Sequence, residues 1–236
     1  MMTRAVLTFH SVDDASGALS YAPADFEALL ATLAAARLPI IDLDTLLAEG
    51  TTHGVALTFD DGMRSVLDVA FPILRQHRAP AHLFLCTGAI EGVATAASGY
   101  AMLTWDQITR LARDGVAIEC HTHSHRDLRT LPDAEIDGDC ATADRLIERH
   151  VGRRPRYFAY PFGHANRRVA EWIEKRYEAA FTNRVGFLSM RGGRGRLPRV
   201  DAHYLRGTFT RLPLTAPTMH AYLMFRKGLR LVRGSE

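Results

Sequence analysis

The stretch Val55-Ala56-Leu57-Thr58-Phe59-Asp60-Asp61-Gly62 decides the fold of this 236-residue chain. Its first five residues have the length and the β-branched or aromatic content of a buried strand, and Gly62 is typical of the turn that ends such a strand. Two adjacent carboxylates therefore stand where a buried strand ends. That position favours a functional site built on a parallel α/β framework.

A second polar cluster, His121-Thr122-His123-Ser124-His125, also follows an apolar stretch, Val116-Ala117-Ile118. One carboxylate and two imidazoles would bind a divalent metal and leave positions open for water and substrate, while the second carboxylate would be free to act as a base. The three histidines share a face if the segment is extended, whereas in a helical turn only His121 and His125 meet. His123 therefore remains an alternative ligand.

Strand-like and helix-like patterns alternate along the chain without a long linker, which favours one parallel α/β domain. Periodicity alone leaves an open sheet and a closed barrel as alternatives. The predicted strands are 5–9, 55–59, 82–86, 116–120, 157–160 and 179–182, and the predicted helices are 23–36, 65–77, 105–114, 133–150 and 165–176.

Charge is distributed unevenly. Residues 191–236 contain ten Lys or Arg and two acids, whereas residues 1–190 contain 19 basic and 24 acidic side chains. Near the C-terminus, Tyr222, Phe225, Leu229 and Val232 recur at helical spacing beside basic residues. We expect a main domain over residues 1–210 and a basic helix over 211–236, which either packs on that domain or touches anionic lipid. No motif for nucleic-acid recognition accompanies the charge.

The chain shows no sustained apolar secretory segment after Met1-Met2-Thr3-Arg4, and its three cysteines do not suggest a disulfide framework. We therefore expect a cytoplasmic location. Peripheral contact with the inner face of the membrane through the basic C-terminus is a further option, and it would suit a lipid-linked sugar substrate.

The motif Thr58-Phe59-Asp60-Asp61-Gly62, together with His121 and His125, resembles the polysaccharide deacetylases, the NodB-homology carbohydrate esterases. The resemblance covers most of the chain and implies a distorted (β/α) barrel of about seven parallel strands. It also implies that Asp60 is the catalytic base and that Asp61, His121 and His125 bind a divalent metal. Oxygen and nitrogen ligands suit zinc first, with cobalt, nickel or iron as alternatives.

The segment Phe158-Ala159-Tyr160-Pro161-Phe162-Gly163 resembles the third motif of the branch that includes biofilm poly-N-acetylglucosamine deacetylases. This resemblance implies that the backbone N–H of Phe162 helps to form an oxyanion hole. The commoner motif has an arginine where this chain has Ala159, and we expect Arg199 to supply the missing cation. A strand that ends in a Pro-Gly turn is the structural alternative for this segment.

The general acid of the common family pattern, a histidine in a C-terminal Leu-x-His motif, has no match in this chain. His10 ends the first predicted strand, and the same variant branch implies that it protonates the departing amine. A structural histidine is the alternative.

Together these features predict a metal-dependent hydrolase that removes N-acetyl groups from a glycan containing amino sugars. One alternative keeps the chemistry and changes the substrate to another amide, an imide or an O-acetyl ester. The other is a non-catalytic glycan-binding protein with the same fold.

Overall fold

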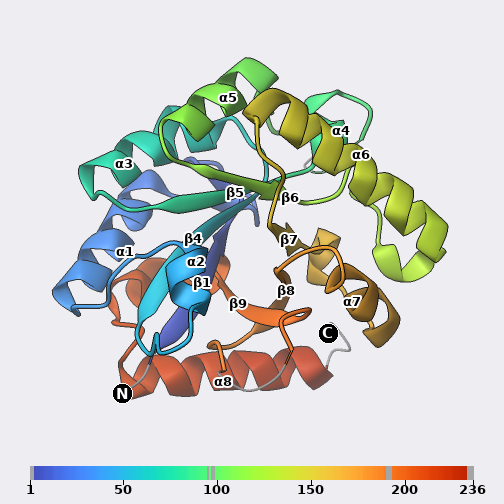
Figure 1. The fold of residues 1–236 in the computed structure, drawn as a ribbon. Coiled ribbons are helices and arrows are strands. Elements are labelled where there is room, and N and C mark those ends of the chain that lie inside the picture. The colour runs from blue at the N-terminus through green and yellow to red at the C-terminus, as the bar shows by residue number, and fades with distance from the viewer. Residues whose placement is uncertain (1–2, 95, 97–98, 190–192, 233–236) are drawn as a thin grey trace.

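Seven parallel strands close into a barrel in the computed structural model, which describes residues 3–94, 96, 99–189 and 193–232 (Figure 1). This arrangement confirms the expected distorted (β/α) barrel. In spatial order the strands are β1 (Arg4–Phe9), β4 (Gly54–Asp61), β5 (Ala81–Leu85), β6 (Ala117–Cys120), β7 (Tyr157–Ala159), β8 (Ala179–Val185) and β9 (Leu197–Asp201), and β9 pairs with β1 to close the barrel.

Helices surround the barrel (Figure 1). They are α1 (Pro23–Ala35), α2 (Leu43–Leu47), α3 (Phe71–Gln76), α4 (Thr87–Ile90), α5 (Trp105–Arg113), α6 (Asp133–Val151), α7 (Arg167–Ile173) and α8 (Pro217–Val232). Shorter elements are the paired strands β2 (Ser11–Val12) and β3 (Ser20–Tyr21), a π-helical turn η1 (Val66–Ala70), and the 3-10 turns η2 (Leu128–Thr130), η3 (Pro161–Gly163), η4 (Ala202–Leu205) and η5 (Gly207–Arg211).

Local sequence explains several helix ends. Thr104 accepts the N–H of Gln107 and the Gln107 side chain accepts the N–H of Thr104, a capping box that begins α5. Helix α6 ends at Gly152, whose φ of 82° lies in the left-handed region that glycine adopts without strain.

Strand alternation divides the core into two parts. Val6, Ala56 and Phe84 belong to a cluster inside the barrel, whereas Leu7 and Leu57 belong to the larger cluster between the barrel and its helices. Successive side chains of a strand point to opposite faces. Continuing the inward series of β4 from Ala56 leads to Asp60 at its carboxyl end, so the fold aims this carboxylate into the mouth of the barrel.

Two parts of the structure differ from the sequence prediction. Strand β9 was not predicted because it contains Pro198, which lacks a backbone donor and normally argues against a strand in a sheet. The helix predicted over residues 65–77 is instead η1 followed by α3. Pro72 near the start of α3 cannot donate a helical hydrogen bond, which is a physical reason for the irregular turn before it.

Helix α8 lies within the range 211–236 expected for a basic C-terminal helix, and residues 233–236 of that range lie outside the described residues. It packs on the barrel through Met219 and Leu223, whereas Phe225 and Leu229 are exposed. The domain boundary placed after residue 210 stays a prediction. Among the described residues, no helix has both the length and the apolar composition that crossing a bilayer requires.

Candidate active site

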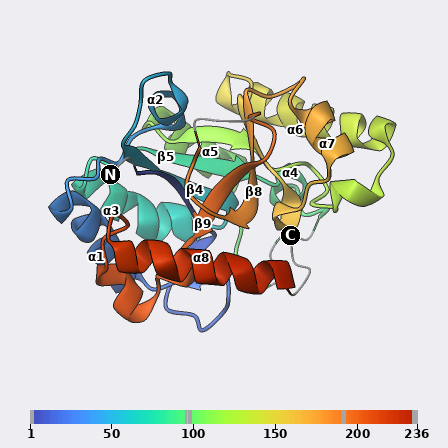
Figure 2. The same ribbon diagram turned by 90° about the horizontal axis from the view of Figure 1, so that it is seen from below.

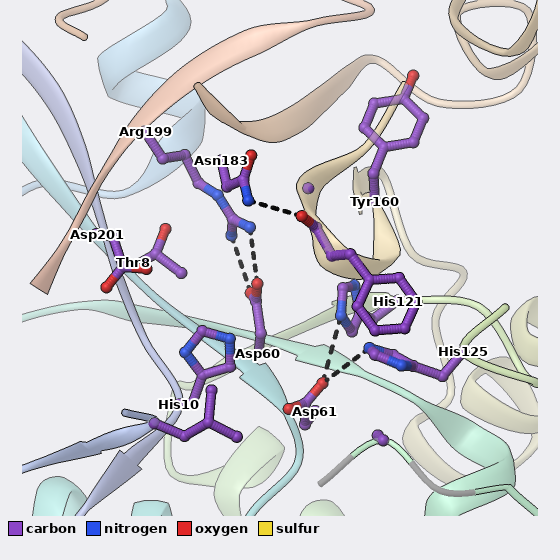
Figure 3. A pocket seen from close by; sticks show the side chains of 14 residues that line it. Thr8, His10, Asp60, Asp61, His121, His125, Tyr160, Asn183, Arg199 and Asp201 are labelled. Carbon is purple, nitrogen blue, oxygen red and sulfur yellow. Dashed lines mark hydrogen bonds and ion pairs between the residues drawn. The ribbon is translucent and has the colours of Figure 1, made fainter. Parts of the chain in front are cut away.

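The seven predicted site residues come together at a cavity of about 340 Å³, which falls in the size range of small-molecule sites (Figure 3). It lies where the barrel strands end in their carboxyl direction, the position at which barrel enzymes carry their chemistry. The predicted residues that line it are His10, Asp60, Asp61, His121, His125, Phe162 and Arg199.

The site begins with a compact group of one carboxylate and two imidazoles. Asp61 Oδ1 lies 3.4 Å from His121 Nε2 and 3.4 Å from His125 Nε2, and all three side chains are buried. Asp61 Oδ1 is also a buried oxygen without a hydrogen-bond partner in the described structure. An unsatisfied carboxylate oxygen facing two ring nitrogens is the donor set expected around a divalent cation.

The orientation of His121 supports this assignment. Its Nδ1–H donates to the carbonyl of Ala159 over 2.8 Å, which leaves Nε2 as the ring nitrogen that faces Asp61. Burial by itself would lower the pKa of His121, but Asp61 and Asp60 outweigh burial and raise it. Burial alone would raise the pKa of Asp61, but His121 and His125 hold it well below its usual range. The carboxylates of Asp60 and Asp61 therefore favour a positive charge beside them, and the group of Asp61, His121 and His125 fits a bound cation.

Backbone conformation brings the ligand atoms together. Asp61 has a φ of 72°, Thr122 of 67° and His125 of 52°, all in the left-handed region that non-glycine residues rarely adopt. The Thr122 hydroxyl accepts the N–H of His125 over 3.0 Å and so stabilises the turn between the two histidines. Strained backbone of this kind concentrates at functional sites because the surrounding structure must hold it in place.

His123 is turned away from the cation group. Its Nδ1 is 3.0 Å from the Thr87 hydroxyl, and its carbonyl accepts the N–H of Gly88 over 2.9 Å. The carboxylate of Asp139 on α6 accepts the N–H groups of His123 and Ser124 over 3.2 and 2.9 Å. His123 thus anchors the loop to its neighbours, and the metal-binding geometry groups His121 and His125 without it.

Asp60 forms a buried, two-pronged ion pair with Arg199. The guanidinium donates from Nη1 to Oδ1 over 2.9 Å and from Nη2 to Oδ2 over 2.7 Å, and each residue is 2% exposed (Figure 3). Arg199 Nε also donates to the carbonyl of Thr182 over 3.1 Å. Burial alone would raise the pKa of Asp60, but Arg199 and His121 outweigh it and lower this pKa below its usual range. The two hydrogen bonds from the Arg199 guanidinium keep the Asp60 carboxylate ionised and fix its orientation.

Phe162 occupies a strained tight turn beside the cavity. The N–H of Gly163 donates to the carbonyl of Tyr160 over 2.8 Å, and Phe162 has φ 59° and ψ 2°. With Pro161 before it, the φ and ψ of Phe162 match the third position of a type II turn, a position that normally holds glycine. The Phe162 ring is 53% exposed and meets the ring of His125 edge-on at 4.8 Å between centroids.

His10 follows β1 and lies beside Asp60, on the side of that carboxylate away from the two ligand histidines (Figure 3). Because His10 continues the inward series from Val6 through Thr8, strand alternation directs it into the barrel mouth. His10 is partly exposed, so solvent reaches it. His203 and His220 are not among the residues that line the cavity.

Two positioning residues were absent from the sequence prediction. Asn183 donates from its side chain to the carbonyl of Phe162 over 2.6 Å, and a Cβ placed on Gly163 would lie 2.3 Å from Asn183 Cγ. Asp139 holds the histidine loop. Asn183 follows the apolar run that begins β8, the same signal that identified the other polar residues at strand ends. Asp139 lies on a helix and carries no such signal.

Comparison with known sequences identifies the family. The sequence model of the family described as "Polysaccharide deacetylase" matches residues 48–179, more than half of the chain. This chain belongs to the polysaccharide deacetylase family. The match includes Asp60, Asp61, His121, His125 and Phe162, whereas His10 and Arg199, the residues expected to replace the general acid and the arginine of the common pattern, lie outside it.

Individual relatives are distant. A chitooligosaccharide deacetylase of Bradyrhizobium sp. (strain ANU 289) is 33% identical over 118 residues, which cover 48% of this chain and 47% of that protein. A chitin deacetylase of Colletotrichum lindemuthianum is 28% identical over 108 residues, or 46% of this chain and 41% of that one. The chain thus spans about half the length of the curated relatives that it matches.

The barrel also resembles solved structures. IcaB from Ammonifex degensii superposes with a TM-score of 0.75 at 24% identity, covering 89% of this chain and 98% of that one. At this level of identity, the likeness concerns the fold.

Proposed function

We propose that this polysaccharide deacetylase family member is a metal-dependent hydrolase that removes N-acetyl groups from a glycan containing amino sugars. The observation that carries the proposal is the buried Asp60–Arg199 pair directly beside the Asp61–His121–His125 group in one cavity. A carboxylate that is held ionised next to a cation site is suited to take a proton from water during amide hydrolysis.

Asp61, His121 and His125 would hold the cation, with zinc the first choice and cobalt, nickel or iron as alternatives. A divalent metal supplies Lewis acidity to such a site: it lowers the pKa of bound water and polarises an acyl oxygen.

Asp60 accepts the proton of the attacking water in this proposal. Its two bonds to Arg199 leave the carboxylate fixed in the barrel mouth, so the base does not have to reorient during the reaction. Arg199 takes the place of the arginine that the common motif carries where this chain has Ala159. It does so from β9, the strand that closes the barrel.

The turn at Phe162 offers a backbone donor for the acyl oxygen. A type II turn rotates its central peptide relative to a type I turn, and this rotation changes the direction of the Phe162 N–H. We propose that this N–H faces the developing oxyanion, where a pre-aimed donor is most effective. The Asn183 bond to the Phe162 carbonyl keeps the turn in this conformation.

His10 protonates the departing amine nitrogen. It stands across the cavity from the cation ligands, so the acid and the nucleophile would approach the scissile amide from different sides (Figure 3). Histidine is the side chain that most often transfers protons in this way.

Acetate release from a pool of N-acetylated oligosaccharides tests the proposal, with metal-reconstituted wild type compared with Asp60→Asn. Release by wild type alone is the expected result. No release by either protein, with metal bound in stoichiometric amount, would indicate another amide, an imide or an O-acetyl substrate. No release and no bound metal would favour a glycan-binding protein.

A further inference from the structure

Helix α8 presents apolar side chains to solvent. Met224 is 63% exposed, Phe225 64% and Leu229 36%. Of the five large apolar side chains that are exposed among the described residues, three lie on this one helix. Exposed apolar residues gathered on one element indicate an interaction surface more strongly than the same residues scattered over a protein.

The arrangement follows from helical geometry. Met219 and Leu223, four residues apart, are buried on the side that packs on the barrel. Phe225 and Leu229, also four residues apart, occupy the opposite side. Figure 2 shows α8 in front of the barrel strands, and no other described element covers its outer side. We refer to Met224, Phe225 and Leu229 as the α8 outer face.

The charge of α8 restricts what this face can bind. The helix sequence contains Arg226, Lys227 and Arg230 and no acidic residue. The Arg226 guanidinium packs over the ring of Tyr204 at 4.6 Å, on the inner side of the helix. A helix that exposes apolar side chains and carries basic residues but no acid is complementary to an anionic surface.

A second copy of the chain is a poorer occupant. Stable protein interfaces bury about 800 Å² on each partner, and three side chains on one helix supply much less. Pairing two copies through α8 would also bring together two helices that each carry three cations and no anion.

We propose that the α8 outer face contacts the surface of an anionic phospholipid bilayer. Met224, Phe225 and Leu229 enter the boundary between headgroups and acyl chains, and Lys227 lies at the level of the phosphates. The helix then lies in the plane of the membrane, as interfacial helices do. This contact does not depend on the proposed catalysis, because α8 contributes no residue that lines the cavity.

Vesicle cosedimentation of the full chain tests the proposal. We compare phosphatidylcholine vesicles with vesicles of phosphatidylcholine and phosphatidylglycerol in equal amounts. We expect binding to the anionic vesicles that is about tenfold stronger and that weakens as salt is raised, because salt screens charge attraction. Binding of wild type to neither kind of vesicle would overturn the proposal.

The variant Phe225→Ser/Leu229→Ser should weaken binding to anionic vesicles by about tenfold, because it removes the inserted apolar groups. Val93→Ser is the matched control, since Val93 is 71% exposed and belongs to the segment that follows α4. Thermal unfolding establishes that both variants are folded. Equal binding by wild type and the double variant would overturn the proposal. So would concentration-dependent dimerisation that the double variant abolishes, which would assign the face to a second copy.

Discussion

The buried pair of Asp60 and Arg199 should show strong energetic coupling. Each residue is 2% exposed, and the two hydrogen bonds between them are 2.9 and 2.7 Å long. Removing one member of such a pair leaves the opposite charge buried, which costs about 3–5 kcal/mol. Removing both charges avoids that penalty, so the two substitutions should be far from additive.

A double-mutant cycle measures this coupling through the free energy of unfolding in denaturant, at one fixed metal concentration. Arg199→Met in the wild-type background should lower stability by about 3–5 kcal/mol. In the Asp60→Asn background, the same change removes a buried cation that has already lost its charged partner, together with its bonds to the Thr182 carbonyl and the Thr58 hydroxyl, and should cost less than about 1 kcal/mol. The difference, about 2 kcal/mol or more, is the coupling energy.

Arg126→Met is the control, because Arg126 and Glu135 form an ion pair of similar length, 2.8 Å, with both side chains more than half exposed. It should cost less than about 1 kcal/mol, since solvent screens exposed pairs. An equal cost of Arg199→Met in both Asp60 backgrounds would refute the reasoning, because it would mean that the two charges do not depend on each other.

Three further predictions concern the cation group and the turn. Asp61→Ala should lower zinc affinity more than about 100-fold in calorimetry, whereas His123→Ala should change it little; the reverse order would reassign the ligands. Asp139→Ala should weaken zinc binding about tenfold, because the histidine loop loses two backbone hydrogen bonds, and excess zinc should restore turnover. Asn183→Ala should lower kcat about tenfold with little change in KM, because the Phe162 carbonyl loses its side-chain donor; a change in KM alone would assign Asn183 to substrate binding.

Sequence patterns were sufficient for much of the barrel. Buried parallel strands read as short apolar runs, and six of the seven strands were identifiable in this way. The seventh, β9, was not, because a proline inside a short run argues against a strand unless its neighbours are known. Its pairing with β1 closes the barrel, and that pairing joins Leu7 with Val200, which lie far apart in the chain.

In the candidate site, too, some features can be identified from sequence patterns and others depend on the fold. The sequence by itself determined that Asp60 and Asp61 stand at the end of one strand and His121 and His125 after another, because polar residues that come directly after apolar runs are visible locally. The expectation for Arg199 came from a family resemblance, and the tertiary structure shows its guanidinium bonded to Asp60. Only the tertiary structure decided that His123 turns toward Thr87 and that α8 exposes Phe225. These outcomes depend on barrel closure, on left-handed backbone turns and on which side of a helix finds a partner. Such long-range contacts leave no periodic signal in the chain.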